Sequence, residues 1–195
     1  FPYFVANDLI PLKELKKLNK ILLSFNEIKE DDIYFQSSSQ TKKTLLPSSK
    51  RYKKLNKNKN FKSINLLFKR LKPIIIKKFK VPIQSFVTKK FQNSKLSYHS
   101  TYSVMRKGYV KSPHLDRRDH LVHLLFYPIS DSSKGGKIKI MKIKKNKKKK
   151  TFDIFPSKKN LIESKLHKEK NNFCLFTLNV PWSYHAVTKY NGKKD

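Results

Sequence analysis

The stretch Tyr109-Val110-Lys111-Ser112-Pro113-His114-Leu115-Asp116 carries the most informative motif of this chain. Its pattern predicts a short strand that ends in a His-x-Asp triplet. Because side chains two residues apart on a strand project from the same face, His114 and Asp116 can hold one metal ion together. A third candidate ligand, His185, follows much later in Trp182-Ser183-Tyr184-His185. In an antiparallel sheet or barrel, neighbouring strands can be far apart in sequence, so His185 can complete the set.

Two imidazoles and one carboxylate form the facial triad that binds non-haem Fe(II) and leaves coordination positions open. Metal bonds of roughly 2.1 Å at adjacent positions require the three ligand atoms to lie within about 3 to 4 Å of one another. We expect His114, Asp116 and His185 to converge in this way. The alternative is three unrelated polar residues, because an isolated His-x-Asp triplet often arises by chance.

The sequence around the triplet predicts an antiparallel β domain. Residues 121–127 and 173–178 are nearly continuous apolar runs, as expected of strands buried on both faces. Residues 137–143 alternate apolar and charged side chains, as a half-buried strand does. Upstream, residues 96–105 and 109–113 are expected to form two short strands on either side of a turn at Gly108.

The N-terminal half of the chain is predicted to be helical. Pro11 precedes an amphipathic segment, residues 12–25, whose apolar positions keep helical spacing and are expected to pack against the sheet. A second helical stretch, residues 64–79, is interrupted by Pro73. Residues 37–60 are rich in Ser, Lys and Asn and are expected to form a loop.

Length and composition limit the class of protein. The 195 residues have room for one domain, and the 14 Phe and 9 Tyr can build its core. The single cysteine, Cys174, lies in an apolar strand and cannot form a disulfide within the chain, which favours a reducing, cytoplasmic location. No apolar run is long enough to span a membrane.

The net charge of +33 raises the question of nucleic-acid binding. Most of the 46 basic residues are lysine, whereas a reader of phosphates or bases is expected to use more arginine for bidentate contacts. The abundance of Lys, Asn and Ile indicates a nucleotide bias of the genome. The arginines are Arg51, Arg70, Arg106, Arg117 and Arg118.

The order of these pieces resembles the Fe(II)/2-oxoglutarate-dependent oxygenase superfamily, near its prolyl 4-hydroxylase-like branch. The resemblance covers the chain apart from its middle insert. The motifs that carry it are Gly108-Tyr109 through His114-Leu115-Asp116, Leu124-Leu125-Phe126-Tyr127, Gly135-Gly136, Ser183-Tyr184-His185 and an N-terminus of Phe1-Pro2-Tyr3-Phe4-Val5 followed by Asp8-Leu9-Ile10-Pro11.

This resemblance implies one domain, residues 1–195, with a double-stranded β-helix, a jelly-roll or cupin-like barrel over about 96–195, and helical support over about 1–95. It implies a dioxygenase (hydroxylase) in which Fe(II) is held by His114, Asp116 and His185. The co-substrates would be 2-oxoglutarate and O2, with ascorbate as an additional cofactor. The carboxylate Asp116 favours hydroxylation, since halogenating relatives lack it. The substrate would be a protein side chain or a small metabolite, with release of succinate and CO2.

The resemblance also bears on the 2-oxoglutarate contacts. The far carboxylate is usually bound by an Arg or Lys nine to eleven residues past the second histidine. Lys194 lies at this spacing and is the first candidate, and Lys193, one residue earlier, is the second. The Asn191-Gly192 turn signal predicts a hairpin after His185. We therefore interpret the chain as a fragment whose last strand, with the main anchor, follows Asp195. Tyr102 and Tyr109 are further candidates for touching the co-substrate.

Other readings remain open at this point. A cationic, non-catalytic module on the same fold could bind nucleic acid or another polyanion, and a cupin-like isomerase could use a similar barrel. Of the remaining histidines, His120 and His123 are three residues apart, so on one strand they would face opposite sides and at most one could approach the metal. His99 and His167 are interpreted as ordinary surface or core residues.

Overall fold

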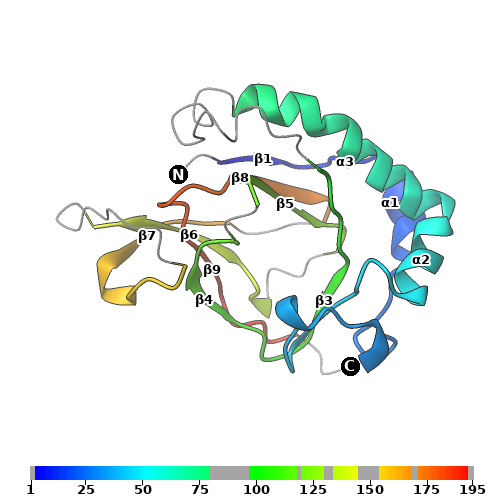
Figure 1. Ribbon diagram of the computed structural model, residues 1–195, viewed down its shortest axis with the longest axis horizontal. Helices are drawn as coiled ribbons and strands as arrows, with labels where there is room; N and C mark the ends of the chain where they lie inside the picture. The colour runs from blue at the N-terminus through cyan, green and yellow to red at the C-terminus, as the bar shows by residue number, and fades with distance from the viewer. Residues whose placement is uncertain are drawn as a thin grey trace. The chain divides into compact units, whose positions relative to one another are not determined.

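The computed structural model describes residues 3–79, 97–117, 120–129, 134–144, 154–167 and 171–192. Within these residues the chain is mainly β, with nine strands in antiparallel sheets and three α-helices (Figure 1). Backbone contacts divide the chain into two compact units. We call residues 1–11 and 107–194 the β unit, and residues 12–106 the helical unit.

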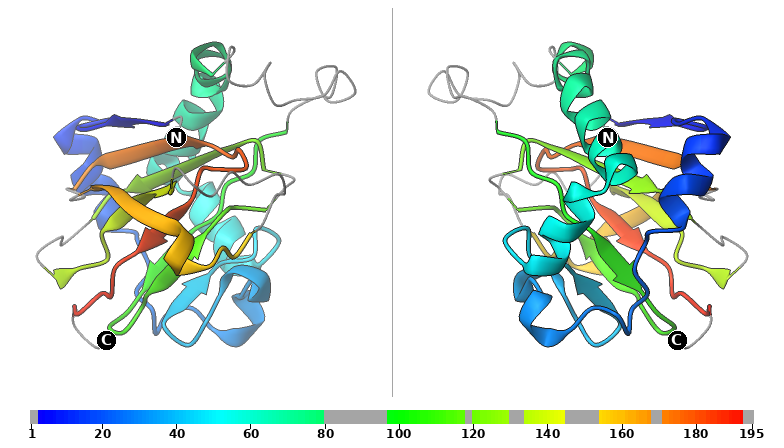
Figure 2. Two further views of the ribbon diagram at one scale, coloured as in Figure 1. Left: turned by 90° about the vertical axis from the view of Figure 1, so that its left-hand side faces the viewer. Right: turned by 90° about the vertical axis from the view of Figure 1, so that its right-hand side faces the viewer.

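The β unit contains two antiparallel sheets, one with the strand order β1-β8-β5 and one with the order β4-β9-β6-β7. Figure 1 shows both, and Figure 2 shows them from two sides. A short 3-10 helix, η4 (Lys158–Asn160), precedes β7. The strands are β1 (Tyr3–Ala6), β4 (Lys111–His114), β5 (Val122–Tyr127), β6 (Ile138–Ile143), β7 (Leu161–Leu166), β8 (Phe173–Leu178) and β9 (His185–Val187).

The chain passes back and forth between these two sheets. From β4 it crosses to β5, returns for β6 and β7, crosses again to β8 and returns for β9. The expectation of a mainly β fold with antiparallel sheets and additional helices is therefore confirmed. The two sheets do not close into a barrel within the part of the chain that the structure describes.

The main core of the β unit lies between the two sheets. Ile138 and Ile140 on β6 pack with Phe173 and Leu175 on β8, and all four side chains are at most 4% exposed. Leu125, Tyr127 and Tyr3 pack against this group. Burying each large apolar side chain contributes roughly 1.5 to 3 kcal/mol, so these contacts hold the sheets face to face.

The same inner faces become polar toward one end of the strands. His123 shares a face of β5 with the core residues Leu125 and Tyr127, because alternate residues of a strand point to the same side. Its partner across the β5–β8 pair is Thr177, and His185 on β9 is paired with Ile140 on β6. The interface between the sheets is therefore apolar at one end and contains histidines at the other.

A second apolar cluster underlies this polar end. Leu115, Leu161 and Tyr184 are at most 6% exposed and pack with Met141 and Ile143. Leu115 and Tyr184 are the sequence neighbours of the candidate ligands. Neighbouring residues of an extended chain point to opposite faces. Because Leu115 and Tyr184 point into this apolar cluster, the side chains of the candidate ligands point to the opposite face.

The first strand belongs to the β unit and not to the helical part. β1 pairs with β8 along its length, and the rings of Phe4 and Phe176 are stacked 4.4 Å apart. Asn172 fixes the chain that follows: its Oδ1 accepts from Ile10 N at 3.0 Å, and its Nδ2 donates to Ile10 O at 2.6 Å. The division between the units thus differs from the expected boundary near residue 95, because these pairings join the N-terminus to β8.

The helical unit holds the remaining elements. Its strands β2 and β3 pair with each other, and a single residue, Asn58, separates α2 from α3 (cyan to green in Figure 2). The elements are α1 (Leu12–Asn19), η1 (Glu30–Asp32), η2 (Phe35–Ser37), β2 (Lys42–Thr44), α2 (Lys50–Lys57), α3 (Lys59–Lys78) and β3 (Ser103–Met105). None of the helices in the described ranges is long and apolar enough to cross a membrane.

Two local predictions for this unit are wrong. Residues 37–60 are not a loop, since they contain β2 and α2, and the Ser49 hydroxyl caps α2 by accepting from Tyr52 N. α3 also continues through Pro73 without a break. The buried residues Phe61, Phe68 and Ile75 form one apolar stripe on α3, and their packing offsets the lost backbone hydrogen bond of proline.

Candidate metal centre

His114 and His185 face each other across two neighbouring strands. β4 and β9 are antiparallel, and their register pairs His114 directly with His185. Residues in such a pair have their Cβ atoms about 4.5 to 5.5 Å apart on one face of the sheet. Accordingly, the two imidazole rings lie 4.4 Å apart, centroid to centroid. Strand pairing therefore juxtaposes two residues that are distant in sequence.

Asp116 completes the cluster from just beyond the end of β4. Its Oδ1 lies 3.7 Å from His185 Nε2, and the ligand atoms of His114, Asp116 and His185 all lie within 4.8 Å of one another. This spacing is wider than the expected 3 to 4 Å, so binding one ion with bonds of about 2.1 Å requires the side chains to close in by about 1 Å. The structure thus brings together the three residues predicted as ligands.

Backbone carbonyls orient both histidine rings. His114 Nδ1 donates to Ser112 O at 2.8 Å, and His185 Nδ1 donates to Ser183 O at 3.3 Å. A carbonyl oxygen can only accept, so Nδ1 carries the hydrogen and Nε2 of the neutral ring keeps its lone pair. An imidazole held in this way is oriented for metal binding through Nε2.

The electrostatics favour the protonation state that a metal requires. Burial, together with the neighbouring His185, lowers the pKa of His114 to about 4. Burial also lowers the pKa of His185, against the opposing effect of Asp116. For Asp116, burial alone would raise the pKa, but the adjacent histidines, His123 first, hold it well below its usual range. At neutral pH the cluster is two neutral imidazoles and one carboxylate.

A fourth side chain, His123, contacts the carboxylate from the other sheet. Its Nδ1 lies 2.6 Å from Asp116 Oδ2. His120 lies before β5 begins, and its ring centroid is 6.0 Å from that of His123. The premise that both histidines lie on one strand is therefore wrong, and His123 is the one that approaches Asp116.

Backbone carbonyls at and after Asp116 are bonded to one amide that sequence reasoning missed. Asn179, next to the end of β8, directs its Nδ2 to three backbone carbonyls: Asp116 O at 3.3 Å, Arg117 O at 2.7 Å and His120 O at 2.9 Å. This shared donor fixes the chain on the C-terminal side of Asp116. An asparagine after a buried strand gives no sequence signal for such a role.

A compact turn presents His185 to the cluster. The Ser183 hydroxyl donates to Val180 O at 2.8 Å and accepts from Val180 N at 3.0 Å. Tyr184 is fully buried, and its carbonyl accepts from Met141 N at 2.9 Å. Tyr184 is therefore a packing residue, whereas Trp182 is 38% exposed. Together these contacts fix the backbone that carries His185.

The predicted co-substrate residues have different positions. Tyr102 belongs to the helical unit, where its hydroxyl donates to Leu23 O at 2.7 Å, and burial raises its pKa. Tyr109 is buried next to β4, and its burial raises its pKa to about 12. Lys193 and Lys194 lie outside the described residues.

The strand expected to follow the Asn191-Gly192 turn lies outside the described residues. β9 already has β4 on one side and β6 on the other, so His185 does not lie on a strand that lacks a neighbour. Beyond β9 the chain continues in the same pairing: Tyr190 N donates to Tyr109 O at 2.8 Å, and Asn191 N donates to Lys134 O at 2.6 Å. Gly135 allows this approach, because a Cβ there would lie 2.0 Å from Lys189 O.

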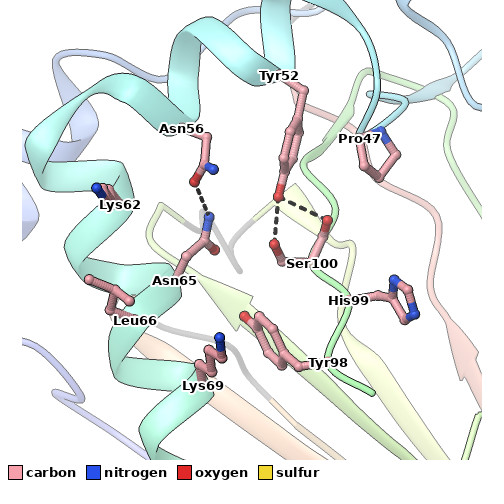
Figure 3. A pocket seen from close by; sticks show the side chains of 10 residues that line it. All are labelled: Pro47, Tyr52, Asn56, Lys62, Asn65, Leu66, Lys69, Tyr98, His99 and Ser100. Atoms are coloured by element: carbon pink, nitrogen blue, oxygen red, sulfur yellow. Dashed lines mark hydrogen bonds between the residues drawn. The ribbon is translucent and has the colours of Figure 1, made fainter.

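The helical unit has a pocket of its own, between α2, α3 and residues 98–100 (Figure 3). Its volume is about 320 Å³. The Tyr52 hydroxyl donates to Ser100 O at 2.9 Å, and Asn65 Nδ2 donates to Asn56 Oδ1 at 3.1 Å. The residues that line it are Pro47, Tyr52, Asn56, Lys62, Asn65, Leu66, Lys69, Tyr98, His99 and Ser100. With one histidine and no carboxylate or thiol, this lining is not a metal-binding set.

Comparison with models of known protein families gives no match, and comparison with curated proteins gives no significant match.

Proposed function

We propose that this chain is a non-haem Fe(II)/2-oxoglutarate-dependent dioxygenase that hydroxylates a protein side chain or a small metabolite. The observation that carries the proposal is the direct pairing of His114 with His185 across β4 and β9, with Asp116 beside them. Two imidazoles and one carboxylate on one face are the facial triad of non-haem iron enzymes.

The path of the chain supports a double-stranded β-helix as the fold of this enzyme. Successive strands from β4 to β9 alternate between two facing antiparallel sheets, which is how a jelly-roll fold is wound. The cluster lies at the polar end of the space between these sheets, next to the apolar core. The side chains of His185 and Asp116 are only 8% and 12% exposed, so burial limits their contact with water.

The residues of the cluster fit a divalent metal in charge and in orientation. His114 and His185 would each offer Nε2, because their Nδ1 atoms donate to backbone carbonyls. Asp116 would offer Oδ1, because Oδ2 is bonded to His123. Bound iron would supply the oxidative decarboxylation of 2-oxoglutarate to succinate and CO2, coupled to hydroxylation of a substrate. The protein residues would orient the ion and neutralise part of its charge.

Lys111 supports the binding of a dicarboxylate near this site. It lies on β4, three residues before His114, and its charge lowers the pKa of both His114 and His185. Its ammonium group lies 5.9 Å from the centroid of the Phe155 ring, which is largely exposed. A cation at this position would attract the negative charge of 2-oxoglutarate.

The test is turnover of 2-oxoglutarate with Fe(II), O2 and ascorbate, measured as succinate by mass spectrometry. We expect the wild-type chain to form succinate and Asp116→Ala to form none, while circular dichroism spectra of the two agree. The matched control is Asp31→Ala, since Asp31 is an exposed carboxylate of the helical unit. Normal succinate formation by Asp116→Ala would show that the cluster is not the catalytic site.

A further inference from the structure

A close side-chain contact of the cluster is made by a residue outside the ligand set. His123 Nδ1 lies 2.6 Å from Asp116 Oδ2, and the two side chains are 35% and 12% exposed. An ionised carboxylate can only accept, so His123 donates from Nδ1. A hydrogen bond to a charged acceptor at this distance belongs to the strong class.

This bond connects the two sheets of the β unit. Asp116 follows β4 in the four-stranded sheet, whereas His123 lies on β5, at the edge of the three-stranded sheet. The backbone of β5 at His123 is fixed, because the next residues on the same face, Leu125 and Tyr127, pack in the core between the sheets. The donor therefore comes from a rigid element and reaches across the polar end of that core.

Because of this bond, the two carboxylate oxygens of Asp116 have different surroundings. Oδ2 is engaged by His123, while Oδ1 lies 3.7 Å from His185 Nε2, on the side of the candidate ligands. The two oxygens of an ionised carboxylate are equivalent, so the bond fixes the orientation of the carboxylate group. With one oxygen engaged by His123, the other faces the cluster.

We propose that His123 is a positioning residue that holds Asp116 through Oδ2 and so presents Oδ1 as a single ligand to a divalent metal ion. This inference rests on the proposed function only in that the cluster binds a metal. Hydrogen bonds of this kind, from a residue outside the ligand set to a ligand, typically contribute about 10- to 100-fold in metal affinity.

The substitutions that test this role differ in whether they keep the donor. His123→Leu removes it and suits an apolar strand, and His123→Val does the same with a β-branched side chain, should the leucine variant fail to fold. His123→Asn keeps an N–H close to the position of Nδ1 and is the conservative rescue. The control, His99→Leu, removes a histidine of the helical unit whose ring contacts the Ser97 hydroxyl at 3.1 Å.

The experiment is calorimetric titration of each full chain with Co(II), together with the visible absorption spectrum of the bound ion. We expect His123→Leu to bind Co(II) about 10- to 100-fold more weakly and with a changed spectrum. His123→Asn should recover most of the affinity and the wild-type spectrum, and His99→Leu should equal the wild type. The rescue by His123→Asn and the absorption spectrum of the bound ion distinguish a positioning role from a merely structural one, because a structural role would alter folding alone.

The possible failures are distinguishable. If His123→Leu and His123→Val bind Co(II) as the wild type does, the positioning role is wrong and the metal site stands. An asparagine variant as weak as the leucine variant would overturn the hydrogen-bond account. If metal binding depends on His123 as expected but 2-oxoglutarate is not turned over, the positioning role stands and the proposed dioxygenase is wrong. A wild-type chain that binds no Co(II) overturns both.

Discussion

The cluster of the β unit and the pocket of the helical unit both contain polar side chains, but they differ in the kinds of side chain and in what those side chains are bonded to. In the cluster, each histidine donates from Nδ1 to a backbone carbonyl, so its other nitrogen converges on the remaining ligands. In the pocket, the Tyr52 hydroxyl and the Asn56–Asn65 pair are bonded to neighbours within the lining. Polar side chains form a metal site only when the hydrogen bonds of their other atoms leave the ligand atoms directed at one point.

The largest expected effect separates the histidines of the two regions. His185→Gln should weaken Co(II) binding by more than about 100-fold, since loss of a ligand costs more than the 10- to 100-fold typical of loss of a partner to a ligand. His99→Gln in the pocket should leave the affinity unchanged. Calorimetric titration of both variants measures this, and an equal loss for both would mean that the ion binds without a preference for the cluster.

The next effect concerns how the backbone of each region is supported. Leu115, between His114 and Asp116, is 1% exposed, whereas Leu66 in the pocket wall is 42% exposed. Leu115→Ala should lower the free energy of unfolding by about 2 to 3 kcal/mol through lost burial and a cavity. Leu66→Ala should change it by less than about 0.5 kcal/mol.

Denaturant titration, followed by circular dichroism and by the fluorescence of the single tryptophan, Trp182, measures both values. Trp182 lies in the β unit and reports on the region that contains Leu115. A small effect of Leu115→Ala would show that the turn around His114 and Asp116 does not depend on the apolar cluster behind it.

The strands that form the apolar core of the β unit could be predicted because their patterns are strong. The apolar runs became β5 and β8, and the alternating run became β6. β7 was not predicted, because its sequence, LIESKL, is neither a continuous apolar run nor a regular alternation, and most of it is exposed. The convergence of His114 with His185 followed from ligand chemistry, but the register that pairs them depends on strand contacts distant in sequence.

The contacts behind the ligands could not be predicted. His123 is visible in the sequence, but its bond to Asp116 depends on how two sheets face each other. Asn179 has no local motif. The expectation that the strand of His185 lacks a neighbour was wrong, because β9 pairs with both β4 and β6 through contacts distant in sequence.

A smaller effect on the stability of the β unit is expected when the pH is lowered. Burial lowers the pKa of His167, with a contribution from Lys165, and its Nε2 has no hydrogen-bond partner among the described residues. The unfolded chain takes up protons near the usual histidine pKa of about 6.5, whereas the folded chain does so only at lower pH. Stability is therefore fully present above pH 6.5 and declines as the pH falls below it.

His167→Phe removes one of these protonations and suits the neighbouring rings of Tyr3 and Phe173. We expect its unfolding free energy, measured by denaturant titration at pH 7.5, 6.0 and 5.0, to decline less steeply than that of the wild type. His114 and His185 are also neutral when folded and should keep part of the decline. A variant with the wild-type slope would show that His167 is protonated without loss of packing.

The smallest effect tests whether the pocket is a binding site for anions, as a cationic module would require. Lys62 and Lys69 line it from α3, whereas Lys77 and Lys78 lie exposed in the last turn of the same helix. In a chain of net charge +33, we expect any two lysines to contribute equally to the general attraction of a polyanion. Both double variants, Lys62→Gln with Lys69→Gln and Lys77→Gln with Lys78→Gln, should therefore weaken binding of a short single-stranded DNA by at most about threefold at low salt, with the same small reduction in salt dependence.

Fluorescence anisotropy over a series of salt concentrations measures both quantities. A loss of more than tenfold for the pocket pair alone would instead give the helical unit a specific anion site, and the two regions would then both be functional.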